Sequence, residues 1–277
     1  MKLFNLMLAA LVSGAVAVTS FAAETAPAKP TVKKKAVKKA KKAKKAKRTL
    51  EQDLAVVTNP APAIPKRHVK RLAEKKAYAE KHGKEVKILM LGDSITHYWE
   101  RKDAKDPAKD ATAVHAKYLA PYKYLNLGCG GDRTQHTLWV VEKSGILELI
   151  KPQLVTLMIG TNNATRNDYR ATIAGIKRIL ERVREKYPQT PILLYAIFPR
   201  GADNQNPNRI ENEKVNAEIV KFCDGKNIIW IDINQNFLTP EGILTTEVMP
   251  DLLHPRKSKS YAIWGESLKP YFEKYGK

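Results

Sequence analysis

The amino-acid sequence predicts an α/β protein with a doubly wound, flavodoxin-like parallel sheet of five strands and helices on both faces. Short apolar segments alternate along the chain with longer amphipathic segments, which is the pattern of repeated β-α units. The strand segments are apolar along their whole length, which indicates strands buried on both faces. Right-handed crossovers between parallel strands then leave the doubly wound arrangement as the expected topology.

The first predicted strand covers residues 86–91 and ends at Gly92, directly before Asp93 and Ser94. An apolar run closed by a turn residue is typical of a buried strand. Because ligands of open α/β sheets bind beyond the carboxyl ends of the strands, Ser94 is expected at that edge, at the start of the next helix. Taken alone, a Gly-Asp-Ser tripeptide is more often an ordinary capped turn. A functional role for Ser94 therefore needs support from the rest of the chain.

The remaining elements follow in alternation. A clear amphipathic helix is predicted over residues 169–187, because apolar residues recur every three or four positions, Asp168 can cap its start and Pro188 ends it. Further strands are predicted at residues 122–127, 154–159, 192–197 and 228–231. Further helices are predicted at residues 65–84, 112–120, 134–143, 145–150, 209–223 and 258–275.

The N-terminus has the layout of a secretory signal peptide over residues 1–22. A lysine is followed by an apolar run from Leu3 to Val18 and then by small residues that suit cleavage. The apolar run is short for a membrane span, so a membrane anchor is the less favoured alternative. The predicted localisation is therefore secreted or periplasmic.

Residues 23–50 form a Lys- and Ala-rich basic tail that cannot bury a core and is predicted to be disordered. Residues 1–50 hold 13 Lys and Arg against one acid, Glu24, and so supply +12 of the total formal charge of +21. Such a block can attach the protein to an anionic polymer or surface, or it can serve only as a solubilising spacer. The signal peptide argues against a nuclear or cytosolic nucleic-acid partner. Residues 51–83 are predicted to be a linker and a solvated helix, followed by the main domain at residues 84–277.

The chain contains two cysteines, Cys129 and Cys223, which are too few for a disulfide framework. Each lies in an otherwise apolar segment. Two buried free thiols are therefore favoured over a bridge.

A serine hydroxyl needs an adjacent base to act as a nucleophile, and one histidine of the chain suits that role. Among the six histidines, only His254 has an Asp three residues upstream, Asp251, on a loop bounded by prolines. An Asp in this position can fix the imidazole tautomer and stabilise the imidazolium. His97 is the main competitor as base, but it follows Ser94 on the same helix and would reach the hydroxyl proton with difficulty.

Four polar stretches lie at or after the carboxyl end of a predicted strand, the fourth of them in the last long loop, and together they resemble the SGNH (GDSL-type) esterase and lipase family. They are Gly92-Asp93-Ser94, Asn126 to Asp132, Gly160 to Asn163, and Asp251 to Pro255. The resemblance covers about residues 84–275. The wording NLGCGGDRT, VTLMIGTNN, FPRG and DLLHP is most similar to the catalytic subunits of platelet-activating-factor acetylhydrolases and to related bacterial acetylesterases.

The resemblance implies a catalytic triad of Ser94, Asp251 and His254. It also implies an oxyanion hole made of the backbone N–H groups of Ser94 and Gly131 and the side-chain amide of Asn162. Many family members carry Asp at the position of Asn163, and the acetylhydrolase-like branch shares this Asn.

Three further side chains are candidates for lining the site, namely Trp99, Trp139 and Arg200, although both tryptophans are equally compatible with the core. No His, Cys and Glu cluster has metal-ligand spacing, and no glycine loop fits a dinucleotide or phosphate pattern. We therefore expect no metal and no cofactor.

Three functions are compatible with this sequence. The first is a secreted serine esterase that removes short acyl groups, most simply acetyl, from a carbohydrate or lipid. The second is an O-acyltransferase on the same fold. The third is a non-catalytic protein that binds an anionic polymer, against which the intact set of site residues argues. The oligomeric state is not indicated by the sequence.

Overall fold

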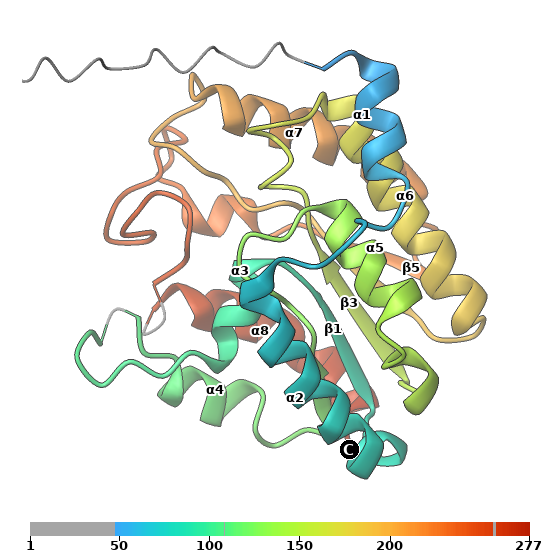
Figure 1. Ribbon diagram of the computed structural model, residues 1–277. Coiled ribbons are helices and arrows are strands. Elements are labelled where there is room, and N and C mark those ends of the chain that lie inside the picture. Colours follow the sequence, from blue (N-terminus) through green and yellow to red (C-terminus); the bar gives the residue numbers. More distant parts are fainter. Residues whose placement is uncertain (1–47, 108, 257–258) are drawn as a thin grey trace, which may run out of the picture. The chain divides into compact units, whose positions relative to one another are not determined.

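The computed structural model describes residues 48–107, 109–256 and 259–277, so the predicted signal peptide and nearly all of the basic tail lie outside the described residues (Figure 1). Five parallel strands form one sheet in the order β2-β1-β3-β4-β5, which is the predicted flavodoxin-like order. The strands are β1 (Ile88–Gly92), β2 (Tyr124–Asn126), β3 (Leu154–Met158), β4 (Ile192–Tyr195) and β5 (Ile228–Ile231). In the register of the two central strands, Met90 lies opposite Thr156.

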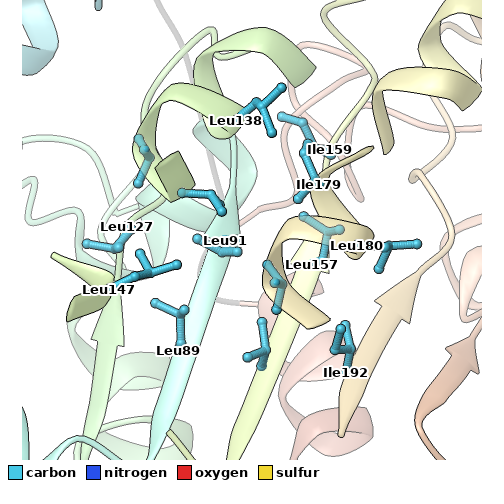
Figure 2. Packing of buried hydrophobic residues seen from close by; sticks show 14 of the residues in the cluster. Leu89, Leu91, Leu127, Leu138, Leu147, Leu157, Ile159, Ile179, Leu180 and Ile192 are labelled. Carbon is cyan, nitrogen blue, oxygen red and sulfur yellow. The ribbon is translucent and has the colours of Figure 1, made fainter. Parts of the chain in front are cut away.

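Helices cover both faces of the sheet. Buried side chains of α2 (Lys66–His82), α5 (Thr134–Lys143), α6 (Tyr169–Lys186) and α7 (Pro207–Ile219) pack with one face. Side chains of α3 (Ser94–His97), α4 (Thr112–Tyr118) and α8 (Ser260–Tyr275) pack with the other. Strand β1 shows the alternation, because Leu89 and Leu91 join the first cluster, part of which Figure 2 shows, whereas Ile88 and Met90 join the second.

Most elements match the prediction within two or three residues. The predicted helix at residues 145–150 is wrong in type, because only a 3₁₀ turn at Leu147–Leu149 forms there. Helix α7 begins two residues before its predicted start. Asn206 accepts the N–H groups of Asn208 and Arg209, and Pro207 follows at the first helical position, where its missing N–H costs nothing.

The predicted linker at residues 51–65 is also partly wrong, because helix α1 (Leu50–Val57) occupies its first half and begins at the last residue assigned to the tail. Thr49 and Gln52 form a reciprocal capping box at its start, a local signal that the neighbouring prolines obscured. The carboxylate of Asp53 is buried and accepts the side-chain amide of Asn167 at 2.8 Å, which ties α1 to the loop after β3.

The predicted solvated helix before β1 is present as α2, but one of its faces is packed against the domain. Leu72 and Ala79 are buried there, and Arg71 and Lys75 both bind the carboxylate of Glu100. The folded unit thus begins well before residue 84.

Two further observations concern the cysteine side chains and possible membrane spans. Cys129 and Cys223 are both free, the first buried and the second half-buried. Among the described residues, no helix combines the length and the apolar character needed to cross a bilayer.

Candidate active site

Strand β1 ends in a tight turn that places Ser94 at the carboxyl edge of the sheet. A β-carbon on Gly92 would lie 2.6 Å from the carbonyl oxygen of Met158 and 2.1 Å from Oγ1 of Thr96, so this close approach requires glycine. Asp93 then caps α3 by accepting the N–H of Ile95 at 2.9 Å. The hydroxyl of Ser94 is therefore presented at the first residue of α3, and the residue as a whole is only 6 % exposed.

The structure brings Ser94, His254 and Asp251 together in one chain of contacts. Oγ of Ser94 lies 2.8 Å from Nε2 of His254, and Nδ1 of His254 lies 2.6 Å from Oδ2 of Asp251. Because an ionised carboxylate can only accept, Nδ1 carries the ring proton and Nε2 is left to accept from the serine hydroxyl. The contacts thus have the order of a serine-hydrolase triad.

The loop that carries the imidazole and its carboxylate is held by local contacts. Oδ1 of Asp251 accepts the N–H groups of Leu253 at 3.1 Å and His254 at 2.7 Å. Leu252, which lies between Asp251 and Leu253, has a φ of 54°, in the left-handed region, and this turns the chain back on itself. Burial by itself would raise the pKa of Asp251, but the ring and N–H of His254 hold this pKa well below its usual range. Asp251 therefore stays ionised beside the ring.

His97, the competing candidate for the base, is placed differently. It is His254 and not His97 that contacts Ser94. Burial, together with the charge of Arg71, lowers the pKa of His97 to about 4. His97 is therefore neutral at pH 7.

Residues 127–132, called the glycine loop below, follow β2 and lie against the same turn. At its start, the buried side chain of Asn126 donates to the carbonyl of Thr96 at 2.8 Å and accepts the N–H of Gly128 at 2.9 Å. Further along, Gly131 has a φ of 77°, and Nδ2 of Asn162 donates to the carbonyl of Asp132 at 2.9 Å. The contacts therefore join the loop of Gly131 both to the serine turn and to Asn162.

Asn163 has a structural role that needs an amide. Its Oδ1 accepts the N–H of Thr134 at 3.0 Å at the start of α5, and its Nδ2 donates to Oγ1 of Thr134 and to Oδ1 of Asn167. An aspartate could make the first contact but has no N–H for the other two.

The three further candidates for lining the site make core or supporting contacts in the structure. Trp99 is fully buried among the aromatic side chains of the second cluster, and Trp139 packs against the first cluster. Arg200 donates to the carbonyl of Thr161 at 2.8 Å and so ties the loop after β4 to the loop that carries Asn162. The core interpretation of both tryptophans is therefore correct, and Arg200 supports a site loop.

A cleft of about 380 Å³ opens beside the imidazole, and sequence reasoning missed the residues that line it from outside the His254 loop. The ring of Tyr98 lies 5.2 Å from that of His254, measured between centroids. Tyr98 follows Ser94 by four residues, a spacing that could have indicated its place. The cleft is lined by Tyr98, Arg101, Lys109, Pro250, Asp251, His254 and Pro255.

Within the described part of the chain, one group of metal-ligand types comes together, namely His68, Cys129 and Asp132, whose donor atoms all lie within 4.8 Å of one another. Both ring nitrogens of His68 already face acceptors, the carbonyl of Gly130 at 2.8 Å and Oδ1 of Asp132 at 3.1 Å. Burial raises the pKa of the Cys129 thiol to about 12, so it stays protonated. These donors are engaged with protein groups, and we assign no metal to them.

A serine turn ends a central parallel strand of a doubly wound α/β sheet, and a later loop brings an imidazole and a carboxylate into contact with it. This is the arrangement of residues that serine hydrolases use. Comparison with known proteins agrees, because residues 90–258 match the GDSL-like lipase/acylhydrolase family. The chain belongs to this family, and the protein is a carboxylic ester hydrolase.

The individual proteins to which this chain is similar differ from it at most aligned positions. The chain is 32 % identical over 173 residues to platelet-activating factor acetylhydrolase IB subunit alpha2 of Rattus norvegicus, covering 62 % of this chain and 69 % of the relative. It is 32 % identical over 177 residues to subunit alpha1 of Homo sapiens, covering 64 % and 71 %. Among solved structures, a GDSL-like lipase from Bacteroides thetaiotaomicron is similar with a TM-score of 0.56 and 19 % identity, covering 73 % of this chain and 98 % of that one. A catalytic mutant of an acetylxylan esterase from Geobacillus stearothermophilus gives a TM-score of 0.52 and 16 % identity, covering 69 % and 94 %.

Proposed function

We propose that the protein is a serine esterase that removes short acyl groups, most simply acetyl, from a carbohydrate or lipid by way of an acyl-enzyme. The observation that carries this proposal is the unbroken contact chain from Oγ of Ser94 through His254 to Asp251. An exposed cleft beside His254 gives the leaving alcohol and the attacking water a path to the imidazole.

In this mechanism Ser94 attacks the ester carbonyl carbon while Nε2 of His254 takes the hydroxyl proton. Asp251 stabilises the imidazolium that forms. The C–O bond to the alcohol then breaks, and His254 returns the proton to the leaving oxygen. Water repeats the sequence on the acyl-enzyme and releases the carboxylic acid and free Ser94.

The oxyanion of each tetrahedral intermediate needs N–H donors. We assign this role to the N–H groups of Ser94 and Gly131 and to the amide of Asn162. An amide nitrogen carries two N–H groups, and the contact with Asp132 uses only one of them. The second remains for the substrate.

Two observations support a short acyl group. Ser94 is only 6 % exposed between the surrounding loops, so the acyl group has little room beside it. The proteins similar to this chain include acetylhydrolase subunits and an acetylxylan esterase. We extend the acetyl preference from those proteins to this chain on that basis.

The test is hydrolysis of p-nitrophenyl acetate, butyrate and octanoate, followed by a screen of acetylated glycans and acetylated lipids. We expect the highest kcat/KM for acetate, loss of activity after treatment with a serine-directed phosphonate, and labelling of Ser94. Ser144→Ala serves as a matched control that keeps both labelling and activity. Acetate released in equal amount to p-nitrophenol distinguishes hydrolysis from acyl transfer. Labelling that persists in Ser94→Ala would exclude the proposed nucleophile.

We also propose that the protein is secreted or periplasmic and that its basic N-terminal tail retains it on anionic material. The charge distribution supports this, because residues 1–50 carry +12 of the total +21. Deleting residues 24–47, which leaves the Thr49 cap of α1 in place, should lower the salt concentration at which the mature protein elutes from heparin and leave kcat on p-nitrophenyl acetate unchanged. Equal elution of both forms would show that the domain surface does the binding instead.

A further inference from the structure

Helix α2 binds the glycine loop through a row of carbonyl groups. Arg71 donates from Nε to the carbonyl of Gly128 at 2.9 Å and from Nη2 to that of Asn126 at 3.1 Å. His68, one helical turn earlier, donates from Nε2 to the carbonyl of Gly130 at 2.8 Å. These carbonyls belong to every second residue, so they point to the same side of the extended chain. The family match begins only at residue 90, so α2 lies outside it.

The opposite edge of the loop runs along β1 toward the nucleophile. The N–H of Leu127 donates to the carbonyl of Met90 at 2.9 Å, and that of Cys129 donates to the carbonyl of Gly92 at 3.3 Å. Each pair lies two residues further along both segments than the one before. The same spacing continued once more pairs the N–H of Gly131 with the position of Ser94, just beyond β1.

The peptide group between Gly130 and Gly131 joins the two edges. The N–H of Asp132 donates to the carbonyl of Cys129 at 3.2 Å, and Gly131 has a φ of 77°, which together define a type II turn with glycine at its third position. Carbonyl and N–H of a trans peptide point in opposite directions. The carbonyl of Gly130 faces His68, so the N–H of Gly131 faces away from α2, toward the serine side of the loop.

His68 is itself held in one orientation. Its Nδ1 lies 3.1 Å from Oδ1 of Asp132, and the two side chains are 5 % and 2 % exposed. His136 also approaches this carboxylate, with Nδ1 at 3.7 Å, but that nitrogen accepts the N–H of Arg133. Carboxylate, imidazole and oxygen follow one another here as at Asp251, His254 and Ser94, but the last contact differs. Nε2 of His254 accepts from a hydroxyl, whereas Nε2 of His68 donates to a peptide carbonyl.

We propose that His68 is a positioning residue for ester hydrolysis. It holds and polarises the Gly130–Gly131 peptide group so that the N–H of Gly131 donates to the oxyanion. A hydrogen bond to the carbonyl of a peptide strengthens the donor at its other end, because the two are coupled through the peptide group. Arg71 fixes the two preceding carbonyls and thereby sets the register of the loop. This inference rests on the proposed esterase function.

Two isosteric substitutions separate the two contacts of the ring. In His68→Gln the amide nitrogen takes the place of Nε2 and can still donate to Gly130. In His68→Asn it takes the place of Nδ1 and can reach only Asp132. His115→Gln is the matched control, since His115 is a half-buried histidine on α4 whose ring contacts the hydroxyl of Tyr124.

The readouts are kcat and KM for p-nitrophenyl acetate and the Tm of each variant. We expect His68→Asn to lose about tenfold in kcat with little change in KM, because a misplaced oxyanion donor acts in the transition state. His68→Gln and His115→Gln should keep kcat near the wild-type value. Equal kcat for the Gln and Asn variants, or a kcat that follows Tm alone, would overturn the inference.

The Tm and kcat of His68→Gln cover the case in which His68→Asn does not fold. His68→Gln with wild-type Tm and a tenfold loss of kcat would also contradict the inference, because Gly130 keeps a donor in that variant. Failure of the esterase function itself would look different. The wild-type protein would then be inactive, or no more active than Ser94→Ala, and the variants at position 68 would have the same activity.

Discussion

The two sides of Ser94 are built in different ways. On the glycine-loop side, the side chains of His68 and Asp132 are 5 % and 2 % exposed, and their contacts join segments more than fifty residues apart. On the other side, the side chain of Asp251 is 56 % exposed and that of His254 is 24 % exposed. The contacts of Asp251 stay within three residues of the chain.

This difference follows from what each side does in the proposed reaction. Oxyanion donors stabilise charge only when they are already oriented, which favours a buried and over-determined loop. The imidazole exchanges protons with an alcohol and with water, which favours an exposed loop beside the cleft. Substitutions that affect one side at a time can test the division.

The largest effect is expected from removing the hydroxyl oxygen of Ser94, on which both sides act in the proposed reaction. Ser94→Ala should lower kcat by roughly 10⁴-fold or more, and the double variant with His254→Ala should be little worse, because a triad acts as one unit. The measurement is kcat on p-nitrophenyl acetate with Tm as a check of folding. Retention of more than about a tenth of wild-type activity would contradict the nucleophile assignment.

A smaller but still large effect is expected on the oxyanion side alone. Asn162→Ala should lower kcat by roughly 10²–10³-fold with little change in KM, because an oxyanion donor acts mainly in the transition state. Steady-state kinetics on the same ester decide it. An increase in KM at constant kcat would instead make Asn162 a substrate-binding residue.

The two central glycines of the glycine loop should respond unequally to the same change. Gly131→Ala forces a side chain into a φ of 77° and should cost about 1–2 kcal/mol of stability together with part of kcat. Gly130→Ala is the matched control, because a β-carbon there would lie 3.8 Å from Nδ1 of His97, an ordinary contact. Chemical denaturation compares them, and equal losses would show that φ at Gly131 is not what sets the loop.

The last prediction concerns the pH dependence of stability and not catalysis. Burial raises the pKa of Asp93 to about 7, above the value of about 3.9 expected in the unfolded chain. Between these values the folded state holds a proton that the unfolded state has lost, so this group destabilises the fold progressively as pH rises from about 4 to about 7. Asp93→Asn removes the titration and keeps the oxygen that caps α3.

For this reason, the free energy of unfolding of Asp93→Asn, relative to wild type, should rise between pH 5 and pH 7 and then level off. Urea denaturation at several pH values measures it. A difference between the two proteins that does not change with pH would show that Asp93 stays ionised in the fold.

The sequence predicted those parts of the fold and site that depend on local patterns. The apolar run before Gly92 and the Asp three residues before His254 are both readable in a short window, and both predictions hold in the structure. Helix α1 was missed because prolines after Thr58 outweighed the capping box at Thr49. Its burial depends on Asp53 meeting Asn167, which no local pattern encodes.

The side chains that support the site were harder to predict for the same reason. His68 and Arg71 have the spacing of one helical turn, but only the fold shows that they face the carbonyls of the glycine loop. Lys109 reaches the cleft from a loop with no regular period. Charged residues on a helix are usually solvated, so composition alone favoured that interpretation for α2.

The long reach of the contacts made by α1 and α2 has a consequence for how the enzyme fails on heating. Asp53 meets Asn167 across 114 residues and His68 meets Gly130 across 62, so each contact closes a long loop of chain at a cost in entropy. Peripheral units of a domain open at lower cost than its central strands. Detachment of these helices would release the glycine loop while the sheet persists, so thermal inactivation should precede loss of the far-ultraviolet circular dichroism signal. The temperature limit of the enzyme is then set by the docking of its N-terminal helices and not by the strength of its core.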